Sequence, residues 1–184
     1  MARKALDTGT RISRFEVLNE LSQDAIGFVY SGKDSKGASG TRSVVIREFA
    51  PERLTSRRKK KIQVRDRELQ SEFNQALVTE AYKYERYTEL PSEGLQAGLD
   101  LIEAKGTIYL VVEDASGESL AETLKTDGKF SPGFTRSVLN DILPGLKSLE
   151  EAKLVHSLIS SETILRTADG NFVLTSPYAL QNAE

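Results

Sequence analysis

Apolar positions that alternate with polar ones predict a series of β-strands early in the chain. Residues 15–21 and 26–30 are short β-prone runs on either side of a turn-like segment, which predicts a β-hairpin. A loop rich in Gly, Ser and Lys is expected at 31–42. A third strand is predicted at 43–49, and Pro51 ends it.

The pattern then changes to a helical one. Apolar residues recur at every third or fourth position from Leu69 to Tyr84, which predicts an amphipathic helix that ends near Pro91. Two further strands are expected at 99–104 and 107–113. The first part of the chain is therefore predicted to run strand, strand, strand, helix, strand, strand.

The second part of the chain is predicted to be mainly helical. Ser119 and Glu122 have the spacing of a capping box, which marks the start of a short helix. A longer helix is expected at 132–151, where apolar side chains cover about half of the helical wheel. Pro144 should kink this helix because it removes a backbone donor. A last hairpin is predicted within 162–175.

Composition narrows the classes of function. The 184 residues suffice for one domain or two small lobes, and the net charge of -2 argues against a nucleic-acid binder. The absence of cysteine excludes disulfides and thiolate metal sites. No apolar run follows Arg3 and Lys4, and no segment approaches the roughly 20 apolar residues that cross a bilayer. We expect a cytoplasmic chain without membrane insertion, in which the basic run 57–61 is a solvated loop or a helix start.

Several short strings, in this order, resemble those of a protein kinase, especially of the bacterial Ser/Thr type. The strings that carry the resemblance are 21–30 (LSQDAIGFVY), 43–51 (SVVIREFAP), 108–113 (IYLVVE), 117–120 (GESL), 154–165 (LVHSLISSETIL) and 171–178 (NFVLTSPY). The resemblance implies an α+β fold. A lobe with a five-stranded antiparallel sheet and one long helix would precede a truncated helical lobe with a β-hairpin. The implied boundaries are 1–13 for a flexible N-terminus, 14–114 for the first lobe and 115–184 for the partial second lobe.

The resemblance also places three remnants of a nucleotide site. Gly27 matches one of the family's three loop glycines, whereas Asp24 stands at another. Arg47 stands at the strand lysine, and Glu80 best matches its helix glutamate. An Arg47–Glu80 ion pair is therefore expected, with Glu72 as the alternative partner. No bound cofactor is expected, because Asp24 would direct negative charge at a triphosphate.

The positions that carry phosphoryl transfer in the family hold other residue types here. Leu158 matches the catalytic aspartate and Ser160 the loop lysine. Thr163 matches the asparagine that binds magnesium, and Ser176 the aspartate of D-F-G. No catalytic residue, no metal site and no enzymatic activity are therefore expected. His156, the single histidine, matches a family residue that packs the loop, so a structural role is predicted.

The resulting interpretation is a catalytically inactive pseudokinase that acts as an interaction, scaffolding or regulatory module. One alternative is an atypical kinase-fold enzyme or nucleotide-binding regulator with non-standard residues. Its candidate replacement carboxylates are Glu113, Asp114, Glu162 and Asp169. Another is a generic α+β interaction domain.

The long helix at 132–151 leads to a prediction about partners. A whole kinase domain continues well past D-F-G, and its later elements cover this helix. Here the apolar face would be partly bare, and a large exposed apolar patch marks an interface. We expect self-association or a protein partner to cover the helix, unless the natural chain is longer. The contact is expected around Phe134, Leu139, Ile142 and Leu146.

Overall fold

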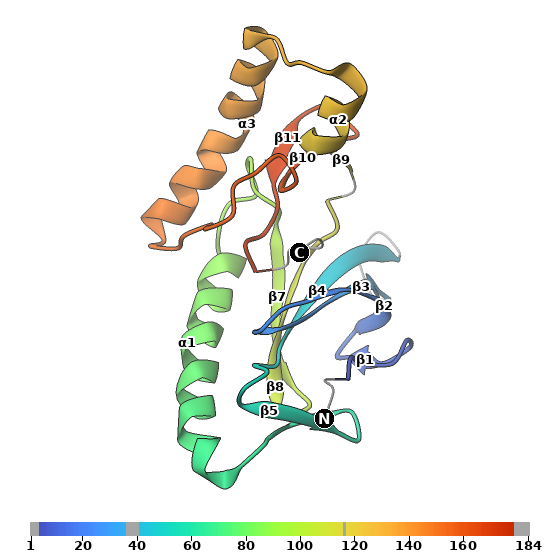
Figure 1. Ribbon diagram of the computed structural model, residues 1–184, viewed down its shortest axis with the longest axis vertical. Helices are drawn as coiled ribbons and strands as arrows, with labels where there is room; N and C mark the ends of the chain where they lie inside the picture. The colour runs from blue at the N-terminus through green and yellow to red at the C-terminus, as the bar shows by residue number, and fades with distance from the viewer. Residues whose placement is uncertain (1–3, 36–40, 116, 179–184) are drawn as a thin grey trace.

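A six-stranded antiparallel sheet forms the first lobe of the protein (Figure 1). The computed structural model describes residues 4–35, 41–115 and 117–178. In spatial order the strands are β1 (Arg11–Ile12), β2 (Phe15–Gln23), β3 (Gly27–Asp34), β4 (Arg42–Phe49), β8 (Thr107–Glu113) and β7 (Gly98–Ala104). Strand β4 and strand β8 are central and almost entirely buried, as expected for runs of Val, Ile and Leu.

One long helix, α1 (Gln70–Thr88), follows a short 3-10 turn, η1 (Arg67–Leu69), and packs along the sheet beside β7 (Figure 1). Its buried side chains are Phe73, Tyr84 and Tyr87, at the three- and four-residue spacing of one helix face. The amphipathic pattern therefore predicted this helix correctly, apart from one residue at its start and about three at its end.

A separate two-stranded hairpin follows β4 and precedes α1 in the chain. It consists of β5 (Thr55–Arg58) and β6 (Lys61–Val64), and Lys59 and Lys60 form its turn. The basic run 57–61 was expected to be a solvated loop or a helix start. The run is instead part of two paired strands and their turn, so the expected loop or helix start was wrong. Residues 58–61 are solvent-exposed as expected, whereas Arg57 points into the protein.

The second lobe contains two helices and a small sheet (Figure 1). Its elements are β9 (Gly117–Ser119), α2 (Leu120–Asp127), α3 (Pro132–Glu151), β10 (Ile164–Thr167) and β11 (Phe172–Leu174). The capping box forms, since the Ser119 hydroxyl accepts the Glu122 N–H at 3.2 Å and the Glu122 carboxylate accepts the Ser119 N–H at 2.8 Å. Strand β9, which the sequence pattern did not predict, pairs with β10.

Three further details differ from the expectations. Residues 4–13 are packed instead of flexible, because Ile12 is buried in a sixth strand, β1, that extends the predicted five-stranded sheet. Strand β3 continues to Asp34, into the predicted loop. In helix α3, Ile142 is buried instead of bare.

Backbone contacts around Gly94 join the two lobes. The Leu174 N–H donates to Gly94 O at 3.0 Å, and the Gln96 N–H donates to Leu174 O at 2.9 Å. Gly94 has φ +69°, and a Cβ there would lie 2.1 Å from Asp141 O on α3. Only glycine fits such an approach without strain. In the part of the chain that the structure describes, no helix is both long and apolar enough to cross a bilayer.

A buried carboxylate ties the sheet to the β5–β6 hairpin. Glu48 in β4 is fully buried, and it accepts hydrogen bonds from the hydroxyls of Tyr30 at 2.8 Å and Tyr109 at 2.7 Å. Its cationic partner is Arg57 of β5, whose side chain is 5% exposed. The Arg57 Nε–H also donates to Lys4 O at 2.6 Å, so the network reaches the N-terminal segment.

Replacing Arg57 by Met should destabilise the protein strongly. Glu48 would remain buried without its cation, and breaking such a pair costs about 3–5 kcal/mol. The free energy of unfolding, measured in urea, should therefore fall by about that amount. Arg58→Met, at the exposed neighbour, is the matched control and should change it by less than about 0.5 kcal/mol. Equal losses in the two variants would contradict this role for Arg57.

Candidate functional site

The buried cation on β4 is already paired within the protein. Arg47 lies on β4 with only 4% of its surface exposed, and its guanidinium donates to the Asp24 carboxylate at 2.7 Å. Asp24 precedes β3 in the hairpin that corresponds to the glycine-rich loop. The same carboxylate oxygen accepts the N–H groups of Ile26 at 2.8 Å and Gly27 at 2.9 Å. Asp24 therefore stabilises the loop through these hydrogen bonds and also pairs with the charge of Arg47.

The electrostatics favour the charged form of both partners. Burial alone would raise the pKa of Asp24, but the hydrogen bond and charge of Arg47, with the two backbone N–H groups, lower it below its ordinary value. Burial likewise opposes the charged guanidinium, yet contact with Tyr84 and Asp24 raises the pKa of Arg47. Asp24 and Arg47 thus form an ion pair at neutral pH.

The predicted Arg47–Glu80 pair does not form. Glu80 on α1 instead accepts a hydrogen bond from Lys83 at 3.0 Å, and Glu72, the alternative, is exposed in the first turn of the helix. The reason is the fully buried Tyr84, one turn beyond Glu80, which lies against Arg47. Burial and the Glu80 charge raise the pKa of Tyr84, against the lowering effect of Arg47.

Gly27 has a packing role in this structure. It pairs with Phe49 of β4, and a Cβ at Gly27 would lie 1.8 Å from Glu48 O. No side chain fits at that distance. The match of Gly27 to a phosphate-loop glycine is therefore also explained by the close approach of β3 and β4.

The loop that corresponds to the catalytic loop is closed by hydrogen bonds from a threonine. The buried Thr163 hydroxyl donates to Leu158 O at 2.9 Å and accepts the Ser160 N–H at 2.9 Å. The Leu158 side chain itself is 55% exposed. Three of the predicted positions are thus brought together, with Thr163 holding the loop through its own hydroxyl.

Ser176 lies beside this loop but is fully buried. The preceding Thr175 N–H donates to Thr163 O at 2.8 Å, which fixes the strand end against the loop. The Ser176 N–H donates to the Gln96 side chain at 2.7 Å, and Gln96 in turn donates to Glu113 O at 2.6 Å. Gln96, which the sequence did not single out, therefore connects Ser176 to the end of β8.

Three tyrosines connect α1 to the segment that follows β11. The ring of Tyr178, two residues after Ser176, lies edge-on to Tyr84 at 5.4 Å between centroids and to Tyr87 at 5.6 Å. Both partners project from α1. Such edge-to-face pairs are each worth about 0.5–1.5 kcal/mol beyond their burial. The segment after β11 is thus held against α1 on the side where Tyr84 meets Arg47.

The replacement carboxylates considered from the sequence do not converge. Glu113 pairs with Arg42, Glu162 is exposed and is held by the Ser160 hydroxyl, and Asp169 lies in the exposed turn between β10 and β11. Burial and the nearby Glu113 raise the pKa of Asp114. Among residues 4–35, 41–115 and 117–178, no three His, Asp or Glu side chains are grouped so that they could hold a metal ion.

Comparisons with known proteins identify the fold as protein kinase-like. The apo form of PpkA-294 matches 96% of this chain and 62% of its own, with a TM-score of 0.75 and 22% identity. The Mycobacterium tuberculosis PknI kinase domain matches 98% of this chain and 63% of its own, with a TM-score of 0.63 and 14% identity. The predicted α+β, kinase-like architecture is confirmed, with the six-stranded sheet noted above.

Two curated relatives are named as kinases. Serine/threonine-protein kinase B of Synechocystis is 32% identical over 85 residues, which is 46% of this chain and 15% of that protein. Serine/threonine-protein kinase STE20 of Debaryomyces hansenii is 27% identical over 161 residues, or 88% of this chain and 13% of that protein. No protein-family model matches the chain. The chain thus spans about a seventh of the length of these relatives.

These names correct one sequence-based expectation. The substituted residues at positions 158, 160, 163 and 176 had led to the conclusion that the chain is not an enzyme. The curated relatives are instead named serine/threonine protein kinases, which points toward an enzyme. Substitution at family positions alone was therefore too weak a basis for excluding activity.

His156 gives a pH-dependent prediction. It is buried, and its Nε2–H donates to Thr175 O at 2.7 Å, in agreement with a packing role. Burial lowers the pKa of His156 below its ordinary 6.5, against smaller raising effects of backbone contacts. The unfolded chain therefore binds more protons, so this contribution to stability is complete above about pH 6.5 and is lost as the pH falls toward the folded-state pKa.

The measurement compares the free energy of unfolding of the natural protein and His156→Gln from about pH 7.5 to about pH 5.5. As the pH falls, only the natural protein should lose the stability that depends on neutral His156. Its free energy of unfolding should then fall by at most about 1.4 kcal/mol per pH unit because of this residue. Glutamine retains a donor for Thr175 O and does not titrate. Identical pH profiles would show that His156 is already free to take up a proton in the folded state.

Proposed function

We propose that this chain is a regulatory, protein-binding module built on the kinase fold, in which the Asp24–Arg47 ion pair controls access of nucleotide phosphates to the cleft. Supporting this proposal, the cation at the position of the strand lysine is paired internally with Asp24. The proposed setting is the cytoplasm, which fits a chain without cysteine.

The ion pair opposes nucleotide binding in two ways. A triphosphate must displace the Asp24 carboxylate to reach Arg47, and it must then tolerate the Asp24 charge nearby. Two unit charges about 5 Å apart interact by about 3 kcal/mol at an effective dielectric constant near 20. Arg47 nevertheless keeps its positive charge, so the site becomes favourable for phosphate once Asp24 moves away.

This arrangement makes the β2–β3 hairpin the regulated element. A protein partner that holds the hairpin with Asp24 away from Arg47 would raise the affinity for nucleotide. By linkage, nucleotide would then raise the affinity for that partner by the same factor. Both equilibria depend on the same pair of side chains.

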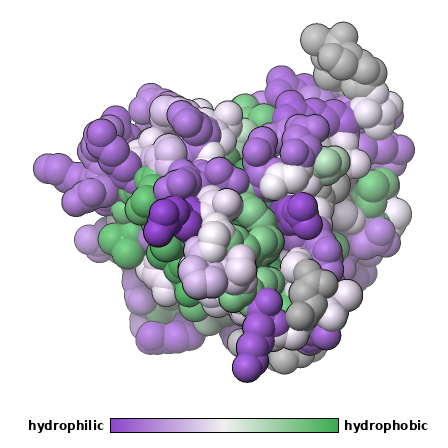
Figure 2. Space-filling model, turned by 90° about the horizontal axis from the view of Figure 1, so that it is seen from above, coloured by the Kyte–Doolittle hydropathy of each residue, from purple (hydrophilic) through white to green (hydrophobic). Residues whose placement is uncertain are grey.

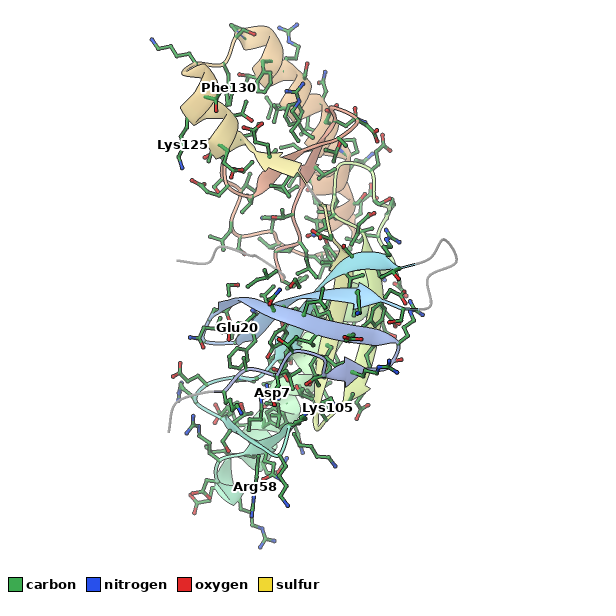
Figure 3. The ribbon with its side chains drawn as sticks, turned by 90° about the vertical axis from the view of Figure 1, so that its right-hand side faces the viewer. Asp7, Glu20, Arg58, Lys105, Lys125 and Phe130 are labelled. Carbon is green, nitrogen blue, oxygen red and sulfur yellow. The ribbon has the colours of Figure 1, made fainter. Side chains whose placement is uncertain are left out.

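Neutralising Asp24 should increase nucleotide affinity. Asp24→Asn keeps an oxygen for the N–H groups of Ile26 and Gly27 but removes the charge that faces phosphate. We expect ATP, measured by calorimetry with and without magnesium, to bind at least about tenfold more tightly to this variant than to the natural protein. The matched control is Glu20→Gln, which removes an exposed charge from the same hairpin (Figure 3).

A second variant tests whether the gain depends on Arg47. In Asp24→Asn combined with Arg47→Met, the increase in affinity should disappear, because no buried cation is released. ATP binding that is equal in the natural protein and Asp24→Asn would contradict the proposal. A gain that persists without Arg47 would also contradict it.

A second part of the proposal concerns protein contacts through α3. Leu139 and Leu143 lie one turn apart on this helix and are 48% and 53% exposed. Phe134 and Leu146 are only partly buried, whereas Ile142 faces the core and cannot contribute. Figure 2, which looks onto the end of the molecule formed by the second lobe, shows hydrophobic surface between hydrophilic side chains. We propose that a second copy of this chain covers these leucines.

Charge at the exposed leucines should abolish self-association. Light scattering should show that the mass of the natural protein rises with concentration, whereas Leu139→Glu with Leu143→Glu stays monomeric. Val78→Glu with Tyr82→Glu changes an equally spaced exposed pair on α1 and should leave self-association intact. A natural protein that remains monomeric at high concentration would rule out this contact.

A further inference from the structure

The β5–β6 hairpin carries a concentration of positive charge that no part of the nucleotide cleft uses. Within residues 51–67 there are eight basic residues and two acidic ones, so this segment has a net charge of about +6. The whole chain has 25 basic and 27 acidic residues, which leaves about -8 on the remainder. The basic residues are Arg53, Arg57, Arg58, Lys59, Lys60, Lys61, Arg65 and Arg67.

The turn of this hairpin uses residues that its backbone disfavours. Lys59 and Lys60 have φ of 47° and 64°, in the left-handed region where Asn and Gly are preferred for a two-residue turn. The two residues that flank them, Arg58 and Lys61, are cross-strand partners of like charge, which also destabilises a hairpin. Local stability therefore does not explain this choice of side chains, and backbone strain of this kind is typical of functional segments.

The positive charges gather at one end of the molecule. Arg58, Lys59, Lys60 and Lys61 are all exposed, and the Ile62 N–H donates to Lys105 O at 2.8 Å, which brings the β7–β8 turn beside the hairpin. Figure 3 shows Arg58 and Lys105 in the lower part of the first lobe, and Lys125 and Phe130 at the opposite end of the molecule. Arg57 points inward to Glu48 and is not available.

These side chains are free for an external anion. Within the described residues, no carboxylate lies within ion-pairing distance of Arg58, Lys59, Lys60, Lys61 or Lys105. The segment 50–67 contains no aromatic side chain, so it offers no platform on which nucleic-acid bases could stack. Lysine ammonium groups are compact point charges that suit a diffuse anionic surface better than bidentate recognition of a single phosphate.

We propose that the β5–β6 hairpin and the adjacent Lys105 bind the surface of a membrane that contains anionic lipids. A flat negative surface contacts only the basic end and repels the acidic remainder, so it orients the molecule with the second lobe pointing away. A flexible polyanion in solution would contact the acidic remainder as well. Ile62 is the apolar residue nearest the turn of the hairpin, and it is buried in the protein. The proposed contact with the membrane is therefore electrostatic and does not insert into the bilayer.

Vesicle co-sedimentation tests this inference. The natural chain should bind vesicles of phosphatidylcholine and phosphatidylserine, mixed at about 3:1, and should not bind phosphatidylcholine alone. Binding should weaken as salt is raised. Lys59→Asn with Lys60→Gly removes two charges and installs the preferred turn residues, so its melting temperature should be equal or higher. Its affinity for the anionic vesicles should fall by about thirtyfold, since each lysine near such a surface contributes about a factor of five.

Controls separate charge at this site from charge in general. Lys59→Gln with Lys60→Gln should show the same loss without the change of turn type. Lys125→Gln with Lys129→Gln removes two exposed charges in and just after α2 and should bind as the natural protein does. Figure 3 shows Lys125 at the end of the molecule opposite Arg58. The inference fails if anionic vesicles do not bind at low salt, or if the two distant substitutions reduce binding equally. It also fails if a DNA duplex or polyglutamate binds more tightly than the vesicles.

Discussion

The ion pair between Arg47 and Asp24 is the interaction on which the rest of this account depends. A guanidinium that is 4% exposed must have an anion beside it, since an unpaired buried charge is strongly destabilising. In this chain the anion comes from the hairpin of the same lobe, where Asp24 also accepts the N–H groups that shape the turn. The positive charge of Arg47 is thereby balanced within its own lobe.

Several other residues of the candidate site also make contacts within the protein. Thr163 closes its loop through hydrogen bonds, and the fully buried Ser176 donates to Gln96. Tyr178 completes the arrangement by packing against Tyr84 and Tyr87 of α1. Some buried polar atoms of these residues have no hydrogen-bond partner in the described part of the chain, namely Arg47 Nε, the Tyr84 hydroxyl, His156 Nδ1 and the Thr175 hydroxyl. The protein kinase-like fold thus holds these residues in contacts that differ from the ones expected from the sequence.

Local patterns predicted the elements, but not the partners of the buried charges. Periodicity located α1, because burial of one helix face leaves a direct trace in the sequence. The two apolar runs on either side of Lys105 and Gly106 located the paired strands β7 and β8. The four substituted positions, among them Leu158 and Ser176, could also be found from the order of the strings. The partner of Arg47 could not, because Asp24 and Glu80 are both acidic and only the packed Tyr84 excludes the second. Arg57 was missed because a basic run gives no indication that one member turns inward to a buried glutamate.

The most direct test is an NMR titration of the Asp24 side-chain carboxyl in the natural protein and in Arg47→Met. The account predicts a pKa of Asp24 below its ordinary 3.8 in the natural protein. Without the guanidinium, burial of the carboxyl should dominate and raise that pKa. A pKa at or above the ordinary value that does not respond to the loss of Arg47 would show that the two side chains are not paired in solution, and the account of the cleft would be wrong.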